Sequence, residues 1–160
     1  MIDVVKILCL GCIVSILEII FFKPLAINLL NHRVPDLLLI YLIYVTNKYG
    51  RSKGIFIAFI FGLIQDLNTQ VNLLGIFSFS KSVFVYLYGI IIYYDKVWSA
   101  ITKNIYIFMC MLIHSWIYYI NHLLSGEMIF NSLTVITLSL ATINYIIYIF
   151  IFRYILKNEI

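Results

Sequence analysis

The chain alternates between long apolar runs and short polar segments. Six runs predict membrane-spanning helices, at residues 4–22, 34–48, 53–67, 73–94, 101–123 and 132–153. A helix needs about 20 residues to cross a hydrocarbon core of about 30 Å. The second and third runs are shorter than this, and the charged turn around Gly50 between them excludes one continuous helix. The pattern therefore predicts a short helical hairpin held inside a six-helix transmembrane bundle.

Composition supports an all-α membrane protein. Hydrophobic residues make up 64% of the 160 residues and charged residues only 11%. A soluble domain carries about 25% charged residues, so a soluble globular protein is excluded. The charges fall at the junctions between the apolar runs, as they do in multi-pass membrane proteins. We therefore expect one transmembrane domain over residues 1–160.

The basic residues predict the orientation, because lysine and arginine collect on the cytoplasmic side of a membrane protein. With a cytoplasmic N-terminus, the inner segments contain eight of them, and the outer segments contain only Lys23 and Arg33. The inner eight are Lys6, Lys48, Arg51, Lys53, Lys96, Lys103, Arg153 and Lys157. The distribution predicts that both termini are cytoplasmic.

Small residues follow one another at four-residue steps along the third run. Gly54, Ala58 and Gly62 are followed by Asp66 at the same spacing, so all four lie on one helix face. A ridge of small residues lets another helix approach closely in lipid. The ridge predicts a close helix contact, either within the bundle or with a partner protein. We favour a contact within the bundle.

Lys81 lies within the fourth run and needs a partner, because a charge near the bilayer centre costs about 2.5–3.5 kcal/mol. Its depth favours an ion pair with Glu18 first and with Asp66 second. The alternative is a lysine that extends toward the membrane surface with no fixed partner.

Other polar residues in the apolar runs have simpler interpretations. Pro35 and Asp36 suit the first turn of a helix, where proline needs no donor and an acid interacts favourably with the helix dipole. His114 and Asn144 lie near mid-membrane on the fifth and sixth predicted helices, and we expect them to form hydrogen bonds between helices.

No enzyme motif or metal-ligand spacing is present in the sequence, so neither catalysis nor a metal or other cofactor is predicted. The abundant tyrosine and phenylalanine residues suit the membrane interfaces and the bundle interior. They do not indicate a surface that stacks on nucleic-acid bases.

The order of motifs between about residues 33 and 90 is similar to that of the rod-shape-determining protein MreD family. Pro35-Asp36 opens a short hairpin with a basic turn, Gly62 precedes Asp66, and Leu74-Gly75 precedes the long fourth apolar run. The resemblance implies that Gly75 belongs to this motif. Outside this stretch, only the hydropathy pattern matches.

The resemblance implies a non-enzymatic scaffold of the bacterial elongation machinery in the inner membrane. Its implied partner is an MreC-like periplasmic protein with one membrane span, acting with MreB-like, RodA-like and transpeptidase subunits in lateral peptidoglycan synthesis. The family also resembles the substrate-binding subunits of energy-coupling-factor transporters in its six-helix architecture. By that analogy, the alternative function is a subunit that binds a vitamin or another small solute.

Overall fold

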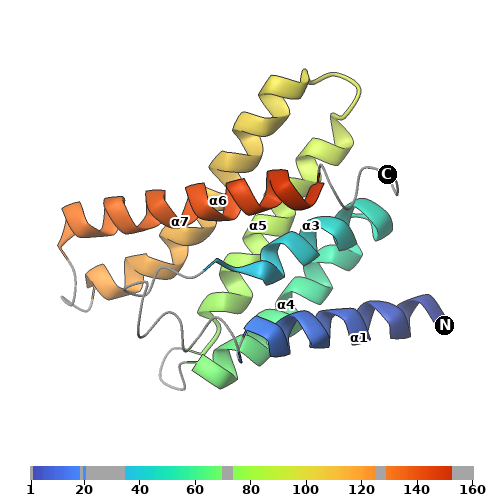
Figure 1. Ribbon diagram of the computed structural model, residues 1–160, viewed down its shortest axis with the longest axis horizontal. Helices are drawn as coiled ribbons and strands as arrows, with labels where there is room; N and C mark the ends of the chain where they lie inside the picture. The colour runs from blue at the N-terminus through green and yellow to red at the C-terminus, as the bar shows by residue number, and fades with distance from the viewer. Residues whose placement is uncertain (1, 19, 21–34, 70–73, 125–128, 153–160) are drawn as a thin grey trace.

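The computed structural model describes residues 2–18, 20, 35–69, 74–124 and 129–152, and these residues form an all-helical bundle (Figure 1). The described part contains six helices, which confirms the predicted all-α class. They are α1 (Ile2–Leu17), α3 (Leu37–Tyr49), α4 (Arg51–Thr69), α5 (Ile76–Tyr93), α6 (Ala100–Leu124) and α7 (Phe130–Ile151). Among the described helices, α5, α6 and α7 are long and apolar enough to cross a membrane, whereas α3 is a shorter apolar helix.

The predicted hairpin consists of α3 and α4, which differ in length. The basic turn is tighter than the sequence suggests: α3 continues through Lys48 to Tyr49, and α4 starts at Arg51. Only Gly50 separates the two helices. Its φ of 87° is readily available to glycine and costly for other residues. As a result α4 is 19 residues long, whereas α3 has only 13.

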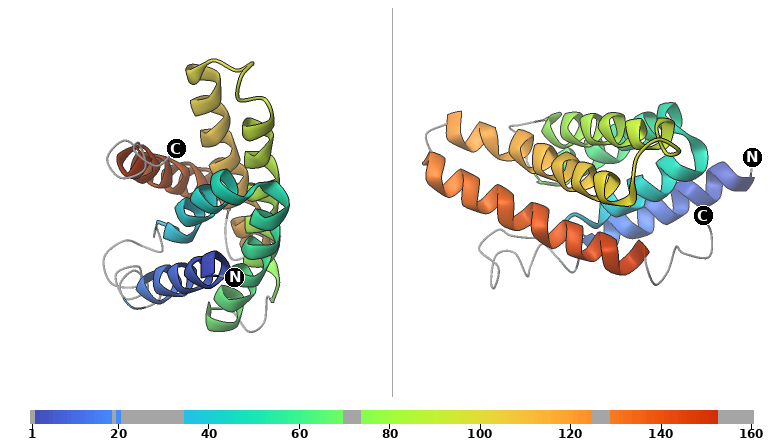
Figure 2. Two further views of the ribbon diagram at one scale, coloured as in Figure 1. Left: turned by 90° about the vertical axis from the view of Figure 1, so that its right-hand side faces the viewer. Right: turned by 90° about the horizontal axis from the view of Figure 1, so that it is seen from above.

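Helix α3 lies at the centre of the bundle. It contacts α1, α4, α5 and α7, and the views in Figure 2 show these helices around it. Its sequence is apolar on every side, and such a helix is stable only when it is buried all round. The predicted burial of the hairpin therefore holds for α3. It does not hold for the whole of α4, since Phe56 and Phe59 on that helix are exposed.

The ridge of small residues on α4 packs inside the bundle. A Cβ atom added to Gly62 would lie 2.4 Å from Cα of Ser78, so the backbones of α4 and α5 meet at this point. At Gly54 an added Cβ would lie 2.6 Å from Oγ1 of Thr46, and Ala58 between the two glycines is fully buried. The favoured interpretation of the ridge, a contact within the bundle, agrees with this geometry.

The outer surfaces of the helices are apolar. Large exposed side chains include Ile13 and Ile16 on α1, Met109 on α6, and Leu138 and Ile146 on α7. In a soluble monomer, exposed apolar patches of this kind are restricted in area. Several polar side chains, among them Lys81 and Asn144, are instead buried inside the bundle, so the apolar outer surface suits a lipid environment.

Candidate functional site: a buried polar cluster

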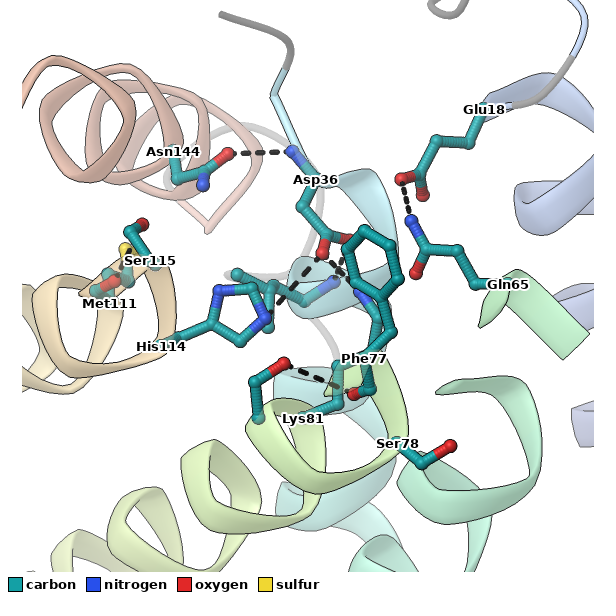
Figure 3. A network of polar contacts seen from close by, with 12 residues as sticks. Glu18, Asp36, Gln65, Phe77, Ser78, Lys81, Met111, His114, Ser115 and Asn144 are labelled. Carbon is teal, nitrogen blue, oxygen red and sulfur yellow. Dashed lines mark hydrogen bonds and ion pairs between the residues drawn. The ribbon is translucent and has the colours of Figure 1, made fainter. Parts of the chain in front are cut away.

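Four polar residues from four parts of the bundle meet in its interior, and we call them the buried polar cluster (Figure 3). They are Asp36 before α3, Lys81 on α5, His114 on α6 and Asn144 on α7. All four are buried, and Lys81 is completely inaccessible to solvent. The cluster therefore brings the start of the central helix α3 together with side chains from α5, α6 and α7.

Asp36 is the partner of Lys81. Nζ of Lys81 forms a hydrogen bond and an ion pair with Oδ2 of Asp36. The predicted pairing of Lys81 with Glu18, and the second choice of Asp66, were both wrong. The prediction placed Asp36 at the end of a membrane span. The short helix α3 instead begins inside the bundle, so its first carboxylate lies next to Lys81.

Asp36 has a second function, which is to cap α3. It is the N-cap residue, and its Oδ1 atom accepts a hydrogen bond of 3.2 Å from the backbone N–H of Leu39. The expectation that Asp36 caps the helix is confirmed. Pro35 precedes the N-cap, so the placement of this proline at the first helical position was wrong by two residues. One carboxylate oxygen thus caps the helix while the other binds the ammonium group.

Asn144 and His114 approach Asp36 from α7 and α6. Oδ1 of Asn144 accepts a 2.9 Å hydrogen bond from the backbone N–H of Asp36, as expected for a hydrogen bond between helices. Nε2 of His114 lies 3.8 Å from Oδ2 of Asp36. The imidazole also makes an edge contact with Phe84, and neither ring nitrogen forms a hydrogen bond with the described residues. The hydrogen bond expected for His114 is therefore not formed within the described part of the chain.

Glu18 lies beside the cluster without contacting Lys81 directly. Its Oε1 atom accepts a 2.9 Å hydrogen bond from Nε2 of Gln65 on α4, which links α4 to the end of α1. Glu18 also interacts electrostatically with Asp36 and Lys81. The sequence analysis did not identify Gln65 as a residue of this site. The sequence did contain a signal for Gln65, because an amide side chain stands in an apolar run directly before Asp66.

Asp66 caps α5 from the neighbouring helix. The residue before α5 is Gly75, which has a φ of 103° and no side chain with which to cap the helix. Asp66 accepts hydrogen bonds from the backbone N–H groups of Phe77 (2.9 Å) and Ser78 (3.1 Å), and from the Ser78 hydroxyl (2.9 Å). These N–H groups belong to the first turn of the helix, which otherwise leaves them unpaired. Gly62 lets the two backbones approach, and the carboxylate four residues later binds the helix end.

Replacing Asp66 by alanine is expected to lower the free energy of unfolding by about 2 kcal/mol, because two N–H groups and a hydroxyl lose a charged acceptor inside the bundle. Thermal unfolding in mild detergent measures the change. Asn68→Ala is the matched control, since it removes a polar side chain from the exposed face of the same helix. Equal melting temperatures for the two variants would contradict the proposed cap.

The buried polar cluster is organised to hold helices together. The Asp36 carboxylate binds a helix end and an ammonium group, and the His114 imidazole lies close to it. Within the described residues, no three histidine, cysteine or acidic side chains are grouped so that they could bind a metal ion. A surface hollow of about 300 Å³ is lined by Ile101, Asn104, Ile105, Phe108 and Tyr145, none of which belongs to the cluster.

Comparison with known proteins gives one finding. The family model described as rod shape-determining protein MreD matches residues 2–158, which is nearly the whole chain. No curated protein and no solved structure matches the chain.

Proposed function

Because this chain belongs to the rod shape-determining protein MreD family, we propose that it is a non-enzymatic scaffold subunit of the bacterial cell-elongation machinery. In this role it binds an MreC-like protein with a single membrane span in the inner membrane. Through that partner it supports lateral peptidoglycan synthesis by an assembly that includes MreB-like, RodA-like and transpeptidase subunits.

The observation that carries the proposal is the internal pairing of the buried polar cluster. Lys81, Asp36 and Asn144 satisfy one another across three helices, and Asp66 satisfies the end of α5. Such pairing fixes the relative positions of the helices. It favours a bundle that presents a constant outer surface to another transmembrane protein.

The test uses a rod-shaped host from which the resident gene has been removed. The tagged chain, produced at the native level, is expected to restore rod shape and to co-purify with the host protein that has a single membrane span. Cells that stay round although the folded chain is present in the membrane would overturn the proposal. Saturable binding of a vitamin, without a co-purifying partner, would favour a solute-binding subunit instead.

We further propose that residues 1–160 form one domain with six spans and both termini in the cytoplasm, an architecture like that of the substrate-binding subunits of energy-coupling-factor transporters. Support comes from the eight basic residues in the inner segments and from the six described helices.

Single cysteines test this topology in a chain whose three native cysteines are replaced by alanine. Cysteines at Asn28 and Glu127 are expected to react with a membrane-impermeant thiol reagent added to intact spheroplasts. Cysteines at Ser52 and Lys103 are expected to react only after the membrane is permeabilised. Labelling of the Ser52 position in intact spheroplasts would reverse the orientation, because that turn contains three of the basic residues.

A further inference from the structure

Arg51, the first residue of α4, is held in a fixed position against α5. The hydrocarbon part of its side chain fills the space left by Gly89, where an added Cβ would lie 2.6 Å from Cγ of Arg51. Beyond this point the guanidinium group lies over the ring of Tyr86, 3.6 Å from the ring centroid. Two contacts thus fix the side chain before any ligand arrives, and the stacking itself is favourable.

The guanidinium group has no anionic partner in the described structure. Within the described residues Arg51 forms neither an ion pair nor a hydrogen bond, whereas Lys103 at the same end of the bundle pairs with Asp95 at 2.5 Å. A guanidinium group has five N–H donors, and stacking on an aromatic ring leaves its edges available. Arg51 is therefore a positioned cation with unused donors.

The surroundings of Arg51 are those of a membrane surface. Tyr86 is 52% exposed, and Lys53, two residues after Arg51 in the first turn of α4, is exposed as well. Tyr106 of α6 interacts electrostatically with Arg51, and it makes an edge contact with Trp98. Tyrosine and tryptophan gather where the hydrocarbon core meets the headgroups, which is also where lipid phosphates lie.

We propose that Arg51, held by Gly89 and Tyr86, binds the phosphate of an anionic phospholipid. Phosphate oxygens can accept two parallel hydrogen bonds from one guanidinium group. A lipid is favoured over free phosphate because Tyr86, on which the guanidinium lies, is exposed on the apolar side of α5. The site is independent of the proposed partner binding.

Native mass spectrometry of the purified chain tests the proposal, with phosphatidylglycerol or phosphatidylcholine added to the detergent. The unaltered chain is expected to retain phosphatidylglycerol, and Arg51→Met is expected to retain roughly tenfold less at the same lipid concentration. Lys6→Met, which removes an exposed lysine from α1, is the matched control and is expected to retain as much as the unaltered chain.

Tyr86→Leu provides a second variant, since it keeps the charge of Arg51 and removes the ring beneath it. It is expected to weaken retention by several-fold. Equal retention by Arg51→Met and Lys6→Met would overturn the proposal, as would equal binding of the two lipids by the unaltered chain. Displacement of the lipid by millimolar inorganic phosphate would show that the site binds free phosphate and would overturn the lipid assignment.

Discussion

Lys81→Met is expected to remove most of the folded protein. The change leaves the carboxylate of Asp36 inside the bundle without its ammonium partner, and breaking a buried pair in this way costs about 3–5 kcal/mol. A loss of this size is a large fraction of the free energy of unfolding of a typical domain, which is about 5–15 kcal/mol. Thermal unfolding in detergent, together with the yield of monodisperse protein, measures the effect.

A second substitution identifies the partner of Lys81. Asp36→Asn removes the charge but keeps an oxygen that can accept the Leu39 N–H, so the cap of α3 is retained. Lys81→Met is expected to cost less in this background than in the unaltered chain, with a coupling energy of about 2 kcal/mol in a double-mutant cycle. The matched cycle with Glu18→Gln is expected to give a smaller coupling. The reverse order would restore Glu18 as the direct partner.

Gly62→Leu is expected to separate α4 from α5 and to lower the free energy of unfolding by about 3 kcal/mol. The first atom of the new side chain would lie 2.4 Å from Cα of Ser78 and 2.7 Å from its backbone nitrogen. Backbone atoms cannot move aside as a flexible side chain can, so the helices must part. Parting them also pulls Asp66 away from the end of α5. Thermal unfolding and the yield of folded monomer in detergent measure the loss.

Phe59→Leu is the control, because it changes an exposed side chain of α4 and is expected to leave the melting temperature nearly unchanged. A Gly62→Leu protein that is as stable as this control would contradict the close contact between α4 and α5. If such a protein also lost its single-span partner on purification, the ridge would instead be part of the partner site.

Local hydropathy predicted the helices well because each helix in a membrane protein must be apolar over most of its length. The fourth predicted span, residues 73–94, contains α5 at Ile76–Tyr93, and the fifth and sixth agree with α6 and α7 to within a few residues. The four-residue spacing of Gly54, Ala58 and Gly62 also identified a packed face correctly. These features depend on neighbouring residues alone.

The partner of Lys81 could not be predicted in the same way. It depends on how deep the start of α3 lies, and that depth follows from the packing of a 13-residue helix among its neighbours. Asp66 was equally ambiguous, since its spacing from Gly62 suggested a helix contact and gave no sign that it caps α5. Gln65 was missed because its partner, Glu18, is 47 residues away in the sequence.

Asp36 and Lys81 are synthesised at different times, and this affects how α3 enters the membrane. Asp36 is made 45 residues before Lys81, so α3 leaves the ribosome without its cation. A carboxylate with no partner is unfavourable in lipid, and α3 is too short to cross a full bilayer alone. We infer that α3 stays beside the insertion machinery until α5 arrives and that the two helices enter the lipid together with α4.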